Sequence, residues 1–449
     1  MQRLKERVEA LFRRRHNSRQ AASSSTQQQP ASQSPTPQQP VSQQPMSANQ
    51  RDVQQQALSR VAATTAGTLS IALENQTSSS QVYAYITGQA LDNNNALFLL
   101  QSDGHTAYYP SSPSGNGSPL SQDVAIALGA PGNIITVTIP RIAGGRIWFS
   151  VDSPLTFLLN PGNPGPGLVE PSATNPSDPN FNVNYSFAEF TFNASQLFAN
   201  ISYVDFVSVP IALTLQDTSG ASYHVSGMPA DGLATVCAEL RAQTARDGRR
   251  WSSLIYTRDG QDIRALSPNN GIVMHPDWFA TYWTPYVQQV YSRFASEALT
   301  INTQAAFGDV TGRTGPLGNL NFGDAGDFAP PSSRDIFSCS TGPFATGDNA
   351  ERNTIIPRLA AAFNRSTLLL PGNQGSDFPN GVSPSQYYTD PTTNHYSRIV
   401  HAANLDHKGY AFPYDDVAPD GGVGQEGAVM SGTPALFTVT VGGRNAYVA

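Results

Sequence analysis

Two carboxylates are the residues best suited to acid–base chemistry, and they stand sixteen positions apart at Glu189 and Asp205. Glu189 lies in an alternating run that places phenylalanines on one face of an extended strand and hydrogen-bonding side chains on the other. Asp205 is the only charged residue between Gln196 and Gln216. A carboxylate in so apolar a strand is costly unless it is partnered or functional. The two acids therefore suit a general acid and a general base. The alternative is a strand acid facing solvent and a buried acid bonded to backbone.

The turn that joins the two strands decides whether these acids can act together. If the hairpin loop has an odd number of residues, such as the five from 194 to 198, Glu189 lies opposite Tyr203 and on the same face as Asp205. Strand rise and spacing then put the two backbones roughly 8 Å apart. That spacing permits the carboxyl separation of about 6.5 to 9.5 Å found in an inverting glycosidase. A loop of even length would put the acids on opposite faces.

Short strands are expected to position these acids. From about Thr68 the chain alternates between β-branched or aromatic runs and clusters of Gly, Pro, Asn and Asp, which is typical of a β-sandwich or barrel. The expected strands cover residues 68–74, 82–87, 97–101, 134–139, 146–151 and 155–159. A last strand over residues 435–441 must pair with something, so we expect it to rejoin the first sheet.

Helical periodicity replaces this pattern between about Ser219 and Asn404. Helices are expected after a cap at Asp231, after Pro285, and over residues 355–363. Four parts follow from these changes of pattern: a tail over 1–66, a β-barrel domain over 67–218 that carries the acids, a mixed α/β domain over 219–404, and a return segment over 405–449 that completes the β-domain. The aromatic residues of the helical region are more typical of core than of sugar platforms, and they are Trp278, Tyr282 and Trp283.

Composition excludes several kinds of function. The 26 basic residues include only two lysines, Lys5 and Lys408, so a Gly-Lys-Ser/Thr phosphate loop is absent from the sequence. Two cysteines cannot build a zinc or iron–sulfur cluster, and no His-Glu-x-x-His occurs, so neither a metal nor a cofactor is expected. Because no stretch approaches eighteen consecutive apolar residues, no transmembrane helix is expected.

Charge divides the chain unevenly. Residues 1–66 hold nine basic and three acidic residues, which is a formal charge of +6. Because the whole chain carries −7, residues 67–449 carry −13. An acidic body repels phosphate, so nucleic acid is not expected as a ligand. Within the tail we expect a short basic amphipathic helix over residues 4–12, followed by a disordered Gln-, Ser- and Pro-rich segment over 20–66. No apolar region follows the first bases, so a standard secretory signal is not seen.

The segment from Tyr185 to Asp217 resembles the catalytic stretch of glycoside hydrolase family 64, the β-1,3-glucanases that release laminaripentaose. In that family an acid in a Glu-Phe-Thr strand is followed sixteen residues later by an aspartate in Val-Asp-Phe, as at Glu189 and Asp205. Three further segments resemble the family in the expected order. They are Gly145–Phe149, which is similar to a Gly-Arg-Ile-Trp strand shared with thaumatin-like proteins, Asp335–Phe344, and Tyr410–Asp416.

The resemblance implies a mainly β fold, with a thaumatin-like β-barrel or sandwich domain and a mixed α/β domain flanking a wide cleft for a glucan chain. Glu189 would protonate the departing glycosidic oxygen, and Asp205 would activate water on the opposite face of the sugar. These roles need unequal surroundings. Apolar neighbours and the second acid should keep Glu189 protonated, whereas Asp205 needs hydrogen-bond donors that keep it ionised.

The resemblance also implies which residues contact the glucan. Thr191 and Asn193 match positions that contact sugar in the family. Ser202 stands where a threonine is expected, and Phe198 stands where a tryptophan is expected. A phenyl ring still stacks on a sugar but lacks the indole N–H, so the product length could differ from a pentamer.

The family setting implies a monomeric endo-acting glucanase whose partner is β-1,3-glucan and which works outside the cell or at the cell wall. A disulfide between Cys237 and Cys339 would fit that location, although Cys237 on a helix could equally be a small buried hydrophobe. Two other interpretations stay open. One is a non-catalytic thaumatin-like protein that binds β-glucan, and the other is a structural wall or surface protein whose tail is the functional part.

Overall fold

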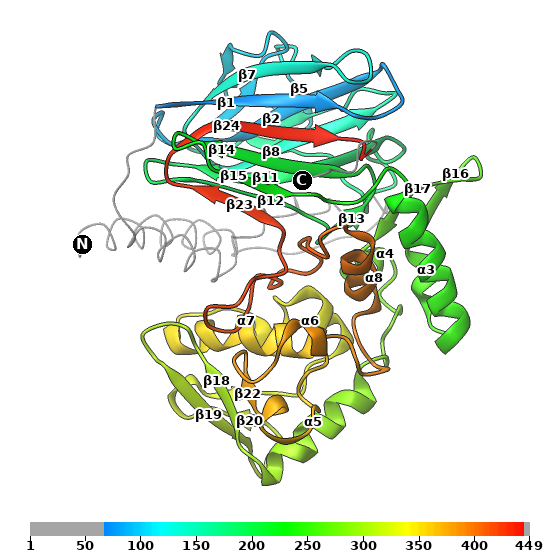
Figure 1. Ribbon diagram of the computed structural model, residues 1–449, viewed down its shortest axis with the longest axis vertical. Helices are drawn as coiled ribbons and strands as arrows, with labels where there is room; N and C mark the ends of the chain where they lie inside the picture. The colour runs from blue at the N-terminus through cyan, green and yellow to red at the C-terminus, as the bar shows by residue number, and fades with distance from the viewer. Residues whose placement is uncertain (1–66, 444–449) are drawn as a thin grey trace, which may run out of the picture. The chain divides into compact units, whose positions relative to one another are not determined.

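A computed structural model describes residues 67–443 of the chain, apart from the side chains of residues 373 and 374 (Figure 1). The helix and the disordered segment predicted within residues 1–66 lie outside this part. Within it, no helix is both long enough and apolar enough to cross a membrane.

Two sheets pack face to face around a common apolar core (Figure 1). The smaller sheet has the strand order β15 (Ser222–Val225), β14 (Ile211–Asp217), β24 (Pro434–Val441), β1 (Thr68–Asn75) and β7 (Ile134–Pro140). The larger has the order β23 (Ala428–Ser431), β12 (Leu197–Ile201), β11 (Asn184–Phe192), β8 (Ile142–Val151), β2 (Val82–Ala90), β3 (Ala96–Leu100) and β4 (Ala107–Tyr108), with β6 (Ile126–Ala127) beside β2.

Strand β24, near the end of the chain, lies between β1 and β14. It runs parallel to β1 and antiparallel to β14. The prediction that this last run rejoins the first sheet is therefore confirmed. A strand in this position is hydrogen-bonded along both sides and leaves no open edge of its own.

Alternation along β11 and β8 separates the core face of the larger sheet from its outer face. Ala188 and Phe190 of β11 are buried, and they pair with Ile147 and Gly145 of β8. Phe190 lies so close to its partner that a Cβ atom on Gly145 would be 2.5 Å from the ring. A larger residue than glycine would collide with this ring. Because side chains alternate along a strand, the next residue, Arg146, lies on the opposite face, beside Glu189.

The fold class agrees with the sequence prediction except in one respect. The described residues form a mainly β structure with helices, but neither large sheet closes on itself, so the sandwich is correct and the barrel is wrong. The strand expected over residues 155–159 is also displaced. Instead β9 (Leu158–Asn160) pairs with β10 (Gly167–Val169) and β5 (Ser118–Pro119) in a small separate sheet. The thaumatin-like topology and the domain boundaries stay predictions.

The region between β15 and β23 holds the α-helices, a five-stranded sheet and two strands of a three-stranded sheet that β13 completes from outside the region. Its helices are α3 (Gly232–Asp247), α4 (Pro268–Met274), α5 (Thr284–Ser296), α6 (Ser333–Ser338), α7 (Ala350–Asn364) and α8 (His395–Ala403). Its 3-10 turns are η1 (Arg250–Leu254), η2 (Gly323–Ala325), η3 (Gly342–Phe344), η4 (Gly372–Gly375) and η5 (Pro384–Gln386). Asp231 precedes α3 as predicted, but its side chain makes no capping hydrogen bond.

The smaller sheets complete this region. One has the order β13 (Phe206–Val207), β17 (Gln261–Leu266) and β16 (Ile255–Arg258). The other has the order β21 (Asp327–Phe328), β20 (Leu320–Asn321), β19 (Asp309–Thr314), β18 (Leu299–Asn302) and β22 (Asp377–Phe378). Because β13 directly follows Asp205, this candidate acid lies where the chain leaves the larger sheet and enters the helical region.

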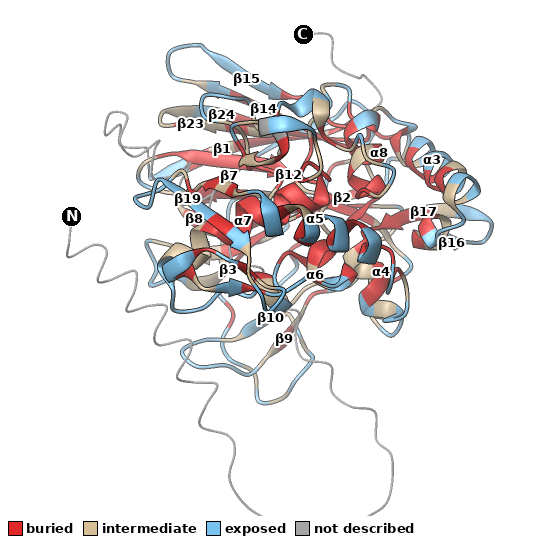
Figure 2. Cartoon of the chain, turned by 90° about the horizontal axis from the view of Figure 1, so that it is seen from below, coloured by how far each residue is buried: buried red, intermediate tan, exposed pale blue. Residues whose placement is uncertain are grey.

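A long stretch of α7 belongs to the core of the helical region, since its residues 355–364 are all buried (Figure 2). Tyr282 and Trp283 are buried too, and both contact the ring of Phe337. The prediction that these two aromatics belong to the core is confirmed. Trp278 is only half-buried and stacks on His275, with ring centroids 4.2 Å apart.

Both cysteines are free and buried, so of the two alternatives the bond between Cys237 and Cys339 is not formed and Cys237 is a small buried side chain. Cys237 lies on α3, whereas Cys339 ends α6, donates to the Ile336 carbonyl and accepts from the Asn364 amide, each at 3.3 Å. Burial raises the pKa of the Cys237 thiol to about 12. Each cysteine thus behaves as a small buried side chain with its own neighbours.

Candidate active site

The hairpin between β11 and β12 has a four-residue turn, because the last strand pair is Phe192 with Leu197. Glu189 therefore lies opposite Asn200 and not opposite Tyr203, so the loop has the even length that was expected to put the two acids on opposite faces. The reason lies in Asn193, whose side-chain oxygen accepts the backbone N–H groups of residues 195 and 196. Such a side-chain turn stabilises a shorter loop than counting alone predicts.

An even loop does not separate the two acids, because the strand ends between them. β12 stops at Ile201, the chain bends at Val204 and Asp205, and β13 pairs with a different sheet. Strict alternation therefore does not extend to Asp205. Its carboxyl group interacts electrostatically with both Glu189 and Arg146. The structure thus brings the two predicted acids into one charged cluster by a bend that the sequence pattern does not reveal.

Glu189 sits opposite Arg146 of β8 on the outer face of the larger sheet. Its side chain is 35% exposed, and its Oε1 lies 3.4 Å from the Arg146 Nη2. The guanidinium of Arg146 also lies over the rings of Phe187 and Trp148, at 4.7 and 5.4 Å. The surroundings of Glu189 therefore combine apolar rings with a cation, whereas the sequence predicted apolar groups and a second acid.

A third carboxylate, Glu170, completes the cluster. It follows β10, and its Oε2 lies 2.5 Å from the Arg146 Nη1. Burial raises the pKa of Glu170 while the guanidinium opposes that rise. Burial alone would lower the pKa of Arg146, but its three carboxylate neighbours, Glu170, Glu189 and Asp205, raise it. Glu170 was not among the residues predicted from the sequence, because it lies in a loop without any motif, and Arg146 was predicted only as part of a strand.

Asp205 is held by the first turn of α4. Its carbonyl accepts the N–H of Ser267 at 2.9 Å and the side-chain amide of Asn270 at 3.0 Å. The same amide lies 3.4 Å from the Asp205 Oδ1. Burial raises the pKa of Asp205, Arg146 lowers it, Glu189 raises it, and Asn270 lowers it, with a net rise. The expected donors are present, but in the free protein they do not outweigh burial.

The predicted sugar-binding residues are distributed around Glu189. Thr191 and Phe198 pair across β11 and β12 on the face that carries Glu189, and both are buried. Ser202 is half-buried and bridges to Tyr410 of the return segment. The side-chain oxygen of Asn193, as described above, is engaged in its turn. Thr191 and Phe198 therefore lie beside the acid, whereas Asn193 directly follows β11 in the turn and Ser202 directly follows β12.

The acids of this cluster are not arranged as a metal site. Across residues 67–443, no group of three or more His, Cys, Asp or Glu side chains is placed to hold a metal ion. The guanidinium of Arg146 occupies the position between the carboxylates that a cation would need. The arrangement instead suits proton transfer between acids of unequal burial.

Comparison with known proteins relates this chain to one family. A model of the β-1,3-glucanase family matches residues 67–441. Two curated relatives, each a glucan endo-1,3-β-glucosidase, come from Cellulosimicrobium cellulans and from an Arthrobacter species, and each is 27% identical over 309 residues. The match covers 67% of this chain and 52% of each relative. The chain thus spans about half the length of the curated relatives it matches.

Solved structures extend the likeness to nearly the whole described chain. A laminaripentaose-producing β-1,3-glucanase in complex with laminaritetraose is 30% identical, with a TM-score of 0.73 over 84% of this chain and 98% of that one. A β-1,3-glucanase domain from Clostridium beijerinckii shares the fold at 21% identity, with a TM-score of 0.63 over the same shares of the two chains. The match of the family model along most of its length shows that this chain belongs to glycoside hydrolase family 64, the β-1,3-glucanases.

Proposed function

We propose that this protein is an endo-acting β-1,3-glucanase that inverts the anomeric carbon and releases short laminari-oligosaccharides such as laminaripentaose. One observation carries the proposal, namely that Glu189 and Asp205 share a charged cluster centred on Arg146. The names of the curated relatives and the laminaritetraose bound to a related enzyme support the substrate class.

Hydrolysis by this pair needs one proton donor and one proton acceptor. In this proposal Glu189 donates its proton to the departing glycosidic oxygen as the bond from that oxygen to the anomeric carbon breaks. Asp205 accepts a proton from a water molecule whose oxygen attacks the same carbon from the other face. The net rise in the Asp205 pKa favours the protonated form of this acid in the free protein. The ionised form that a base needs therefore depends on Arg146 and Asn270, which both lower the pKa.

Residues beside Glu189 are proposed to bind the glucan. Thr191 and Phe198 are neighbours of the acid in the sheet, and Ser202 lies at the far end of β12. Asn193, in the turn, completes the set, which is proposed to line a wide cleft. The protein is proposed to work as a monomer, outside the cell or at a cell wall, because its substrate is a wall polysaccharide.

The first test is incubation of the purified protein with linear β-1,3-glucan, with the initial anomeric form of the products followed by proton NMR. Oligosaccharides that appear first as the α-anomer indicate inversion, because the glucan bond is β. Products that appear first as the β-anomer would overturn the mechanism but keep the substrate. Glucan binding without product would favour the non-catalytic, glucan-binding interpretation. A linear β-1,4-glucan is the matched control substrate.

A further inference from the structure

The position of Arg146 poses a problem for the proposed acid. Arg146 and Glu189 are direct partners in the register of β8 and β11. A guanidinium next to a carboxyl group favours its ionised form. A general acid must instead hold its proton until the glycosidic oxygen accepts it. An arginine in this place would therefore oppose the role of Glu189 as a proton donor, unless the guanidinium pairs mainly with another carboxylate.

The distances from the Arg146 guanidinium to its two neighbouring carboxylates show which of them is its main partner. The Arg146 Nη1 lies 2.5 Å from the Glu170 Oε2, whereas its Nη2 lies 3.4 Å from the Glu189 Oε1. Charge-assisted N–H···O bonds usually span about 2.7 to 2.9 Å, and they weaken beyond that range. Arg146 is therefore strongly paired with Glu170 and only weakly with Glu189.

Arg146 and Glu170 are largely buried, which strengthens the electrostatic interaction between them. The side chains of Arg146 and Glu170 are 19% and 18% exposed, so water screens their pairing far less than that of a surface pair. The rings of Phe187 and Trp148 lie against the guanidinium and limit where it can go. If Glu170 lost its charge, the nearest remaining carboxylate for Arg146 would be Glu189.

We propose that Glu170 is a positioning residue that keeps Arg146 away from Glu189 and so allows Glu189 to retain the proton it donates. This inference rests on the proposed function, in which Glu189 is the general acid. The other ionisable groups that face the cluster are Asp205, which interacts with Arg146 and Glu189, Tyr185 of β11, which interacts with Arg146 and Asp205, and Tyr396 of α8, which interacts with Asp205. All three remain in place when Glu170 alone is changed.

The test is the pH dependence of kcat/KM on linear β-1,3-glucan for Glu170→Gln. The alkaline limb reports the loss of the donated proton in the free enzyme. It should move to lower pH by about one pH unit, because Arg146 turns to Glu189. Adding Arg146→Gln to the same protein should move the limb back up. A merely structural role for Glu170 would lower activity at all pH values and leave the limb in place.

Three comparisons keep the outcomes distinct. Glu297→Gln, which removes the acid of an exposed ion pair with Arg293, is the matched control and should leave the limb unmoved. If Glu189→Gln is inactive but Glu170→Gln keeps the original limb, this inference is wrong and the proposed function stands. If Glu189→Gln stays active, the proposed role of Glu189 fails first. Should Glu170→Gln not fold, Glu170→Asp keeps the charge at a shorter reach, and its limb should move the same way by less; an unmoved limb would overturn the inference.

Discussion

Three carboxylates surround the guanidinium of Arg146. Glu170, Glu189 and Asp205 each interact with its guanidinium, and they also interact with one another. One guanidinium cannot balance three carboxylates in a partly buried site, so the group holds a proton more readily than three separate acids would. The pH limbs of catalysis therefore belong to the cluster, and each must be assigned by substitution.

Substitution of the proposed acid or base should impair catalysis without impairing glucan binding. Glu189→Gln removes the donated proton and Asp205→Asn removes the proton acceptor, so each should lower kcat by about 10²- to 10⁴-fold. Affinity for a laminari-oligosaccharide, measured by calorimetry, should change little because neither variant alters shape. Glu297→Gln and Asp259→Asn change exposed acids in the same way and serve as controls. Substantial activity in either site variant would contradict the assigned roles.

Asn270 should control the acidic limb. Its amide lies near the Asp205 carboxylate and lowers the pKa of that acid, so Asn270→Ala should raise the pKa further. Because the base must be ionised, the acidic limb of kcat/KM should move to higher pH. Ser267→Ala is the matched control, since it removes the cap of the same helix at a cost of about 1 kcal/mol without touching the carboxylate. Equal limbs in the two variants would show that only helix stability matters.

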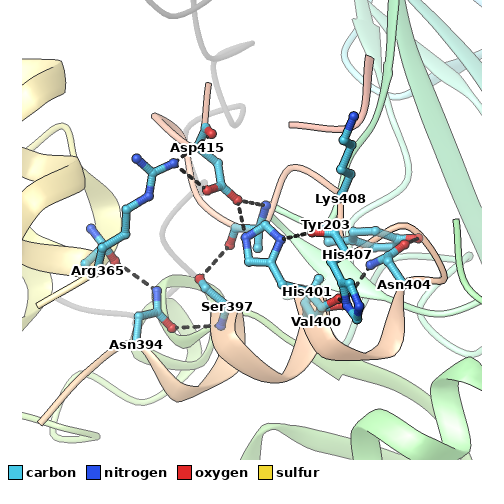
Figure 3. A network of polar contacts seen from close by, with 12 residues as sticks. Tyr203, Arg365, Asn394, Ser397, Val400, His401, Asn404, His407, Lys408 and Asp415 are labelled. Atoms are coloured by element: carbon cyan, nitrogen blue, oxygen red, sulfur yellow. Dashed lines mark hydrogen bonds and ion pairs between the residues drawn. The ribbon is translucent and has the colours of Figure 1, made fainter. Parts of the chain in front are cut away.

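At the scale of elements, one buried aspartate joins α7, α8 and the return segment. Asp415 Oδ1 lies 3.0 Å from Arg365, just after α7, and its Oδ2 lies 2.8 Å from His401 of α8 (Figure 3). The same oxygen accepts the N–H of Ala411. Asp415 and Arg365 are both 0% exposed. The family-like segment around Asp415 is thus a structural junction.

Asp415→Asn should lower stability and flatten its dependence on pH. It leaves the buried Arg365 without a counter-charge, which costs about 3 to 5 kcal/mol. Burial alone would raise the pKa of Asp415, but His401 and Arg365 lower it below its usual value. A lowered native pKa gives stability at neutral pH that is lost as the pH falls through that pKa. Urea unfolding should therefore show the difference between the two proteins shrinking below about pH 4; a constant difference would contradict the pairing.

The elements differ in how far their sequence specified them. Alternation in β11 places Glu189 and Thr191 on one face, because successive side chains of a strand point to opposite faces of the sheet. The four-residue turn depended on the Asn193 side chain, which pattern counting ignores. Glu170 and Asn270 were beyond prediction, since each reaches the site through long-range packing. Local periodicity therefore predicted the strand that carries the acid, whereas the partners that tune it required the tertiary structure.

At the scale of the molecule, the site depends on both the sandwich and the helical region. Glu189 and Arg146 come from the larger sheet. Asp205 is fixed by α4, and the hydroxyl of Tyr396 on α8 donates to the backbone carbonyl of Tyr203 at 2.7 Å. Because β24 then returns to the centre of the smaller sheet, the helical region is held at both of its ends. Neither region alone would assemble the acid and the base together.

This organisation predicts what the first 66 residues contribute to catalysis. The family model begins at residue 67, and β1 starts at Thr68, paired on both sides by β24 and β7. The contacts described for the cluster, between residues 146 and 270, lie within the part that remains after deletion of residues 1–66. The shortened protein should keep the kcat and the products of the full chain on linear β-1,3-glucan. Loss of hydrolysis, in a protein whose unfolding is unchanged, would instead support the interpretation in which the tail is the functional part.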